Sequence, residues 1–352
     1  MARITFAKTV HHVSFLDAKE DDSRKSLSFE IRKDFLTGKV SRVLPFRRRI
    51  PEMKWDEGLL EDSRKDCPFC PGKLPAVTPR FVPEMASEGR IRKGEAWLFP
   101  NAFPYARHSW VVVLCRDHFL HLDQFSIDIL RDGFAVAQEG MERVERTEPH
   151  FRYGSINWNY LPQSGAGLFH PHLQIVIEDV PTVSHQRVME GLRRYEGQCG
   201  ALFWEDYVAE EKRIGERYLG NCGKIHFLIA FSPAGILGEI LVLFSDRSSI
   251  KELTVTDWED LAQGLNRVFR FFKATHIGSF NLSIFSGNDE GTRSWVYGRL
   301  CPRIVIPPWG TSDINYFERL HDEVICVIPP EEMFKNLKPY FADRECKSTS
   351  VC

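Results

Sequence analysis

Two histidines and a glutamine stand at alternate positions in the segment His170-Pro171-His172-Leu173-Gln174, which continues into an apolar run at residues 175–177. Alternate side chains of a strand point to the same side, so His170, His172 and Gln174 are expected to line one face. Burying three such polar groups together costs free energy unless they serve a purpose. The segment therefore predicts a functional face, and two satisfied histidines on a partly exposed strand are the alternative.

A pair of cysteines forms a second candidate site, in the segment Cys67-Pro68-Phe69-Cys70. Cysteines at this spacing are either half of a zinc site or a redox pair. Thioredoxin-like pairs lead into a helix, whereas this pair is followed by a turn at residues 71–73. The chain has no second CxxC, so a structural zinc would need histidines to complete its ligand set. His118 and His170 are the candidates of suitable context.

The composition limits the class of protein that carries these residues. The chain has 352 residues, 43% of them hydrophobic, and 46 basic against 48 acidic side chains, which gives no basic field for nucleic acid. The apolar run at residues 110–115 is far shorter than the ~20 residues of a membrane span. The N-terminus lacks the apolar stretch of a signal peptide, and nine scattered cysteines do not suggest a disulfide framework. We expect a soluble cytoplasmic protein.

The middle and the end of the chain resemble each other. Apolar strands are expected at residues 110–114 and 239–244, and helical periodicity begins at Ser126 and again at Thr256, where Glu259 completes a capping box. The helix starts lie 130 positions apart, and Pro104 and Pro233 lie 129 apart. This regular offset predicts that one αβ unit has been duplicated.

The remaining strands suggest how the elements are arranged. After each helix come two more expected strands, at residues 153–160 and 170–177, then at residues 279–285 and 294–306. Strands that follow one another without helices predict an α+β fold, here duplicated αβ units that form a largely antiparallel sheet flanked by helices. We expect a loose segment at residues 1–27, a first repeat at 28–190, a degenerate second repeat at 191–340 and a tail at 341–352.

These motifs, taken in order, resemble the galactose-1-phosphate uridylyltransferases of the histidine-triad superfamily. The N-terminal signature of that family is similar to residues 28–38 and 44–51, and the end of the chain is similar to the family at residues 316–318 and 328–332. Between them the order is kept by CPFC at 67–70, FPNAFP at 99–104, RDH at 116–118 and HPHLQ at 170–174. The resemblance is strong over residues 28–178 and weaker through the second repeat.

The resemblance implies a structural zinc and a histidine nucleophile. In that family zinc is held by residues that match Cys67, Cys70, His118 and His170, and the nucleophile matches His172. Gln174 would donate a hydrogen bond to a phosphate oxygen. Glutamine cannot act as the acid or base that histidine can, and by resemblance it goes with transferases and phosphorylases rather than hydrolases.

The resemblance also implies substrate contacts and shows departures from the family. Gly167 replaces an expected serine, so Ser164 is taken in its place, and Ile50 replaces an expected arginine, so Arg47, Arg48 or Arg49 must contact the anion. The histidine pair of the second repeat falls in residues 295–300, which hold none, so a second metal site is not expected. The expected substrate-binding residues are Arg47, Asn101, Asn159, Ser164 and Glu318.

The function implied is that of a nucleotidyltransferase acting on a nucleoside-diphosphate sugar. Transfer would run by a ping-pong route through a covalent nucleotidyl-histidine, with a hexose 1-phosphate or inorganic phosphate as acceptor. The family further implies a homodimer in which the C-terminal repeat shapes the sugar pocket of the partner. A dinucleoside polyphosphate phosphorylase and a catalytically lapsed nucleotide-binding protein are the alternatives.

Overall fold

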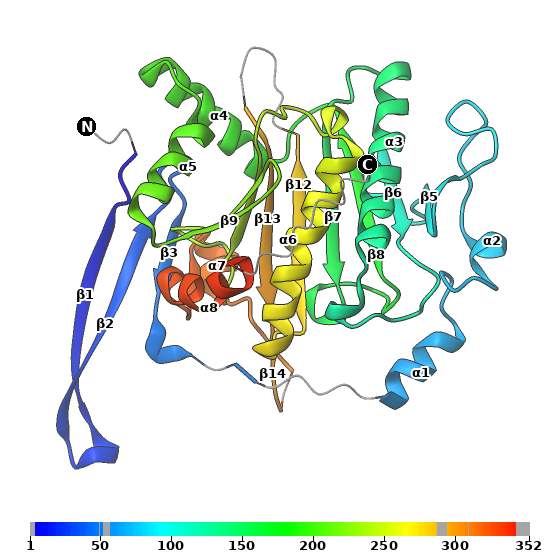
Figure 1. Cartoon of the computed structure of the whole chain (residues 1–352). Helices are drawn as coiled ribbons and strands as arrows, with labels where there is room; N and C mark the ends of the chain where they lie inside the picture. Colours follow the sequence, from blue (N-terminus) through cyan, green and yellow to red (C-terminus); the bar gives the residue numbers. More distant parts are fainter. Residues whose placement is uncertain (1–3, 49, 52–56, 287–293, 309, 343–352) are drawn as a thin grey trace.

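A ten-stranded antiparallel sheet forms the centre of the molecule, with strand order β4-β5-β6-β8-β7-β12-β13-β11-β10-β9 (Figure 1). The computed structural model describes residues 4–48, 50–51, 57–286, 294–308 and 310–342. The expected α+β fold with an antiparallel sheet is confirmed. The strands are β4 (Ile91–Lys93), β5 (Ala96–Pro100), β6 (His108–Val113), β7 (Tyr153–Tyr160), β8 (His172–Glu178), β9 (Tyr218–Cys222), β10 (Ile225–Ile229), β11 (Ile240–Phe244), β12 (Ser279–Phe285) and β13 (Val296–Arg303).

The strand order is symmetric about the central pair β7 and β12. Outward from this seam, the order is β7, β8, β6, β5 on one side and β12, β13, β11, β10 on the other. A long helix stands at the same place in each series: α3 (Ile127–Thr147) between β6 and β7, and α6 (Val255–Ala274) between β11 and β12. This is the arrangement that two related αβ units produce. The repeat boundaries at residues 190 and 340 stay a prediction.

The two long helices cover one face of the sheet and pack on each other. The Ser126 hydroxyl caps α3 by accepting a hydrogen bond from the backbone N–H of Ile129 (3.2 Å). Helix α6 is capped by Thr254 and Asp257, which accept hydrogen bonds from each other's backbone N–H. The expected cap at Thr256 is therefore wrong by two residues, because Thr254 is the last residue in an extended conformation before the helix.

The opposite face of the sheet is covered by different elements in its two halves. Helices α4 (Val183–Cys199) and α5 (Phe203–Ile214) pack on the second half. The first half is covered by the short helix α2 (Leu74–Val77) and by Phe69, which join Phe99, Val111 and Val113 in a small apolar cluster. The two halves of this face are therefore covered by different elements.

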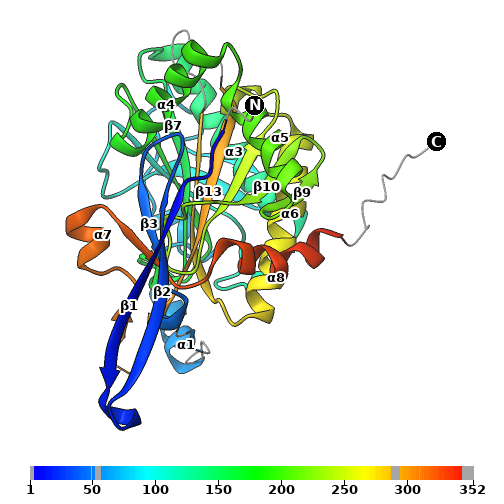
Figure 2. The same cartoon turned by 90° about the vertical axis from the view of Figure 1, so that its left-hand side faces the viewer.

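The N-terminal residues form a long hairpin that projects from the body (Figure 2). Strands β1 (Lys8–Asp17) and β2 (Ser23–Lys33) pair over their whole length, where we expected a loose segment up to residue 27. Alternating Leu27, Phe29 and Ile31 carried the strand signal in the sequence. At its base the hairpin joins β3 (Val40–Val43) and β16 (Val324–Cys326) in a four-stranded sheet.

The remaining elements lie around these sheets. They are α1 (Glu57–Lys65), α7 (Tyr316–His321), α8 (Pro330–Ala342), β14 (Val305–Ile306) and β15 (Thr311–Ser312). Of the expected tail, residues 343–352 lie outside the described part, and residues 341–342 still belong to α8. Within the described residues, no helix combines the length and the apolar character needed to cross a bilayer.

Candidate active site and metal centre

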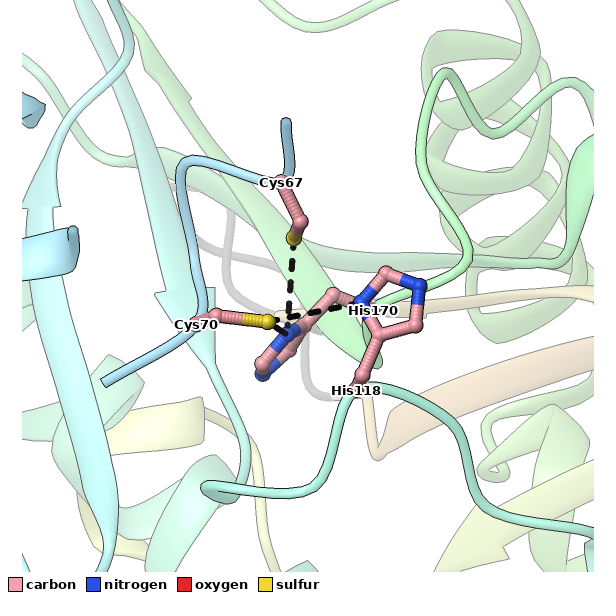
Figure 3. A group of neighbouring side chains, drawn as sticks. All are labelled: Cys67, Cys70, His118 and His170. Atoms are coloured by element: carbon pink, nitrogen blue, oxygen red, sulfur yellow. Dashed lines mark hydrogen bonds between the residues drawn. The ribbon is translucent and has the colours of Figure 1, made fainter. Parts of the chain in front are cut away.

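The four predicted metal ligands converge from three separate segments of the chain (Figure 3). The ligand atoms of Cys67, Cys70, His118 and His170 all lie within 4.8 Å of one another. Cys67 Sγ is 3.7 Å from His170 Nδ1, and Cys70 Sγ is 3.5 Å from His118 Nδ1. A tetrahedral zinc with bonds of about 2.3 Å to sulfur and 2.0 Å to nitrogen has edges of roughly this length. The donor set and its spacing therefore fit a tetrahedral metal ion.

Both histidines of this cluster are oriented by a hydrogen bond from their outer nitrogen. His170 Nε2 donates to the carbonyl oxygen of Cys115 (2.9 Å). His118 Nε2 lies 2.8 Å from the hydroxyl of Ser63, whose own proton is donated to the Leu60 carbonyl oxygen. With Nε2 protonated in both rings, each Nδ1 keeps a lone pair directed at the cysteines. Ser63, on α1, is a supporting residue that the sequence did not reveal.

Burial sets the protonation of the cluster. Desolvation lowers the pKa of His170 to about 4, and it also lowers the pKa of His118, so both rings stay neutral at pH 7. Burial, with the neighbouring Cys67 as a second cause, raises the pKa of Cys70 to about 11. A thiol with this pKa is protonated at neutral pH unless a cation replaces the proton. The cluster can therefore exchange protons for a metal ion.

His172 is the first residue of β8 and lies with its ring buried against the CxxC loop. Its Nδ1 donates a hydrogen bond to the backbone carbonyl oxygen of His170 (2.8 Å). This bond fixes the tautomer, and Nε2, which has no hydrogen-bond partner among the described residues, keeps its lone pair. The Phe69 ring lies 5.4 Å from the His172 ring and 6.1 Å from the His170 ring, measured between centroids. The cluster of cysteines and histidines thus supports His172 through both the backbone of His170 and the ring of Phe69.

Strand β8 begins at His172, two residues later than expected. We predicted that His170, His172 and Gln174 would share one strand face, but β8 starts at His172 and His170 precedes it. His170 is turned towards the cysteines, whereas His172 and Gln174 alternate on β8. The reason is that Pro171 has no N–H to extend the sheet pairing.

Gln174 is held by a residue that the sequence did not single out. The Tyr105 hydroxyl donates to Gln174 Oε1 at 2.5 Å, from the loop between β5 and β6. Gln174 Nε2 is left without a partner among the described residues, so its two hydrogens are available to a ligand. The sequence feature that could have identified Tyr105 as a site residue is its position next to the FPNAFP motif, five residues beyond the end of β5.

Asn159 belongs to a chain of polar contacts that crosses the seam of the sheet. Its Oδ1 accepts a hydrogen bond from Asn281 of β12 (2.6 Å), and Asn281 Oδ1 accepts one from Arg303 (2.6 Å). Arg303 in turn pairs with Asp313 (2.7 Å). On β7 it is Asn157, not Asn159, that stands opposite Gln174. Asn157 is therefore a polar neighbour of Gln174 that sequence reasoning missed, and Asn281 and Arg303 are missed partners in the chain of contacts that holds Asn159.

The side chains of two other expected contact residues form hydrogen bonds with nearby backbone groups. The Ser164 hydroxyl lies 2.9 Å from the carbonyl oxygens of Tyr160 and Leu161 and donates its proton to them. Asn101 Oδ1 accepts from the backbone N–H of Phe103 (3.0 Å), which shapes the loop that carries Tyr105. Both residues shape the loops around the site, and their contacts with substrate stay predictions.

The last two expected contact residues lie apart from His172 within this chain. Arg47 is exposed at the end of a short turn, and no contact among the described residues joins it to His172 or Gln174. Its neighbour Arg48 forms an ion pair with Glu332, and Arg49 lies outside the described residues. Glu318, on α7, is half-buried, and burial raises its pKa, with Asp313 as a second cause. Their roles stay predictions.

In the second half of the sheet, aromatic residues occupy the place of the HPH segment. His185 Nδ1 and the Tyr297 hydroxyl form a hydrogen bond (2.8 Å). The His185 ring stacks on Phe285 and Tyr297, with centroids 5.4 and 5.8 Å away. Residues 295–297, expected to lack a histidine pair, thus contribute to this cluster.

No protein-family model matches the chain. A protein of Archaeoglobus fulgidus that carries the name "Uncharacterized protein" is 27% identical over 315 residues, which are 89% of this chain and 93% of the relative.

Solved structures share the fold over most of the chain. An ADP-glucose phosphorylase of Arabidopsis thaliana with bound ADP-glucose matches with a TM-score of 0.68 at 16% identity, over 88% of this chain and 98% of its own. A GalT-like protein of the same plant gives 0.69 at 16% identity, and a uridylyltransferase gives 0.64 at 19%, both with the same coverage. At these identities the likeness is one of fold. The chain therefore has the same fold as these phosphorylase, GalT-like and uridylyltransferase structures, in agreement with the fold that the sequence resemblance implied.

Proposed function

We propose that the protein is a nucleotidyltransferase that acts on a nucleoside-diphosphate sugar and carries the nucleotide on Nε2 of His172. The observation that supports this most is the hydrogen bond from His172 Nδ1 to the His170 carbonyl oxygen (2.8 Å), which leaves Nε2 as the free lone pair. Burial lowers the pKa of His172, so the ring is neutral and ready to attack. Gln174, two residues along the same strand, offers its amide hydrogens to a phosphate oxygen.

The reaction divides into two balanced displacements at one phosphorus. Nε2 of His172 attacks the α-phosphorus, a P–N bond forms, and the bond from that phosphorus to the bridging oxygen breaks. The sugar 1-phosphate leaves as an anion and needs no proton. In the second step an oxygen of the acceptor phosphate attacks the same phosphorus and the P–N bond breaks. Gln174 stabilises the charge on the phosphoryl oxygens in both steps.

Zinc is the metal that the cysteines and histidines of the cluster suit best, since soft thiolates with imidazoles in a closed tetrahedral set are typical of structural zinc. Its contribution is structural: it fixes the CxxC loop and His170. Phe69 of that loop packs against His172, and the His170 carbonyl oxygen holds His172 Nδ1. The ligands act on the nucleophile only by positioning it.

The structural neighbours support a nucleotide sugar as donor. One is an ADP-glucose phosphorylase with bound ADP-glucose, and others are uridylyltransferases. We test the donor by incubating the protein separately with ADP-glucose, UDP-glucose and a dinucleoside polyphosphate, without acceptor. The expected result is a mass increase of one nucleoside monophosphate, acid-labile and mapped to the peptide that holds His172. An adduct on another residue contradicts the mechanism, and an adduct from the dinucleoside polyphosphate alone contradicts the nucleotide-sugar donor.

We expect Tyr105→Phe to slow transfer about fivefold. The variant removes one hydrogen bond, worth roughly 1 kcal/mol, that fixes the amide of Gln174, while it keeps the ring and the loop. The effect should fall on kcat, because the lost contact orients the residue that stabilises the phosphoryl group. The double variant Tyr105→Phe/Gln174→Ala should be no slower than Gln174→Ala alone. A further additive loss in the double variant would show that Tyr105 acts apart from Gln174.

The rate of the first half-reaction should fall to half its maximum only below pH 6.5. Attack needs neutral His172, and burial lowers its pKa, so the ring is half protonated at a pH below the ordinary histidine value of about 6.5. Single-turnover release of sugar 1-phosphate measures this step without the titration of an acceptor phosphate. A half-maximal rate at pH 6.5 or higher would contradict the assignment of a desolvated His172.

The quaternary structure and the acceptor complete the proposal. We propose a homodimer, as the resemblance implies, with Arg47 and Glu318 contacting the ligand. The acceptor is inorganic phosphate or a hexose 1-phosphate, and either one discharges the nucleotide from His172 in the second step.

A further inference from the structure

A row of polar side chains runs from the candidate active site across the seam of the sheet into its second half. Trp158 of β7 belongs to the apolar core, so its neighbour Asn159 faces the opposite side of the sheet. Leu173 of β8 belongs to the same core, so His172 and Gln174 face the same side as Asn159. Asn159 therefore lies on the face that holds the proposed nucleophile, on the neighbouring strand.

The strand register places Asn159 at the level of His172. Asn157 of β7 stands opposite Gln174 of β8. Because the two strands are antiparallel, a step of two residues forward along β7 corresponds to a step of two residues back along β8. That step leads from Asn157 to Asn159 and from Gln174 to His172. A phosphoryl group attacked by His172 would therefore lie within reach of the Asn159 amide.

The amide of Asn281, on β12, can take only one orientation. Arg303 Nη1 lies 2.6 Å from Asn281 Oδ1, and a guanidinium group can only donate hydrogen bonds. Asn281 Nδ2 therefore faces the other way, and it donates to Asn159 Oδ1 (2.6 Å) and to the carbonyl oxygen of Ser164 (2.9 Å). Both hydrogens of Nδ2 are used. A reversed amide would place Oδ1 against two acceptors and Nδ2 against a cation.

Arg303 is itself held in place by Asp313. Its Nε and Nη2 donate to the two carboxylate oxygens of Asp313, each at 2.7 Å. Asp313 is 5% exposed and also accepts a hydrogen bond from the backbone N–H of Ile304 (3.1 Å). A two-point pair between a guanidinium and a carboxylate adds geometric specificity to its strength. The orientation of Asn281 is thus set by residues of the second half of the chain.

The orientation of Asn159 follows from that of Asn281. Its Oδ1 accepts from Asn281, so its Nδ2 points away, and this Nδ2 has no hydrogen-bond partner among the described residues. A Cβ atom at Gly165 would meet Asn159 Nδ2 first, at 3.9 Å, so the absence of a side chain there leaves the approach to the amide open. The face of the sheet that holds His172 therefore presents an amide donor, which suits an anionic phosphoryl oxygen.

We propose that Asn281, held by Arg303 and Asp313, is a positioning residue that keeps Asn159 turned so that its Nδ2 donates to a non-bridging oxygen of the transferred phosphoryl group. This role rests on the nucleotidyltransferase proposed above. In the opposite orientation Asn159 would direct a carbonyl oxygen at the phosphoryl oxygens and repel them. The second half of the chain thus assists transfer without touching the substrate.

The variant Asn281→Asp tests this role, because it keeps the size of the side chain and its contact with Arg303. A carboxylate cannot donate, so Asn159 must turn its Nδ2 towards it and present Oδ1 to the phosphoryl group. We expect single-turnover formation of nucleotidyl-His172, at saturating donor, to slow about 10- to 100-fold. Asn281→Ala frees the Asn159 amide without inverting it and should cost only about fivefold. A residue that served packing alone would give the reverse order, since aspartate preserves the volume and alanine does not.

The background variant Asn159→Ala separates orientation from other effects. In this background Asn281→Asp should cause no further loss of rate. Repulsion of the phosphate by the new carboxylate, or a shift of the loop at Ser164, would persist there. The matched control is Asn221→Asp, which makes the same exchange at an exposed position of β9, at the far edge of the sheet, and should react at the wild-type rate.

Zinc content and the urea midpoint show which variants are folded. If Asn281→Asp does not fold, Asn281→Ala measured with and without Asn159→Ala decides in the same way. Losses that add in the double variant, or an Asn281→Asp protein faster than Asn281→Ala, overturn the positioning role, while an adduct on the wild type still upholds the proposed function. A wild-type protein that forms no adduct with any of the three donors refutes the nucleotidyltransferase, and this role with it.

Discussion

Replacing His172 with alanine is expected to lower nucleotidyl transfer by about four to six orders of magnitude, because the attacking atom itself is removed. The fold should persist, since the ring contributes only its packing against Phe69 and one hydrogen bond to a neighbouring carbonyl oxygen. The zinc content should also persist, because His172 is not one of the four clustered ligands. The measurement is the steady-state rate with the nucleotide sugar found to form the adduct, together with mass spectrometry of the protein.

Two further variants make this result specific. His226→Ala removes another histidine whose pKa burial lowers to about 4, but which lies on β10 beside Tyr218, and it should transfer at the wild-type rate. His172→Gly leaves space for a small molecule, and added imidazole should restore part of the transfer. A nucleotide adduct that persists in His172→Ala would refute the proposed nucleophile, even with the fold assignment intact.

The second large effect is expected for Cys67→Ser, which should lose bound zinc and several kcal/mol of stability. Structural zinc binds zinc-finger peptides with about 10–16 kcal/mol, and much of this free energy appears as folding stability. Here a bound zinc would tie the CxxC loop to His118 and His170, which lie on two other segments. Zinc per chain by elemental analysis and the urea midpoint of unfolding measure the two losses.

The matched control for the metal is Cys222→Ser. Cys222 lies on β9 and is 1% exposed, so the same hydroxyl is buried without touching the cluster. This variant should keep its zinc and lose much less stability than Cys67→Ser. Wild-type protein that is free of metal yet equally stable, or Cys67→Ser protein with one zinc per chain, would exclude the proposed site.

Short motifs in the sequence predicted part of the candidate site. The CPFC and HPHLQ segments indicated candidate metal ligands, the resemblance implied the role of His172, and the structure brings the four predicted ligands together. The hairpin at residues 8–33 was not predicted, because charged residues interrupt the alternation of apolar and polar side chains that is typical of a strand. Leu27 and Phe29 nevertheless follow that alternation. The cap of α6 was misplaced because Thr254 and Thr256 both precede acidic residues at the right spacing.

Long-range contacts explain what the motifs did not reveal. Asn281 reaches Asn159 only because β12 pairs with β7 across the seam, 122 residues apart in the sequence. Tyr105 meets Gln174 through a loop whose course depends on the β6–β8 pairing. No local pattern encodes the order in which strands lie side by side, so partners set by that order could not be assigned from residue types and spacing.

The pairing of β7 with β12 at the centre of the sheet also determines how a truncated chain behaves. These strands pair in register from Ser155–Phe285 to Tyr160–Phe280, and the residues beneath them belong to one apolar core. Removal of either half would leave the other with a central strand whose N–H and C=O groups face solvent. An unpaired edge of this kind is a template for association with other chains. Truncated products of this chain should therefore aggregate rather than fold into functional half-molecules. In a cell they would accumulate as insoluble protein.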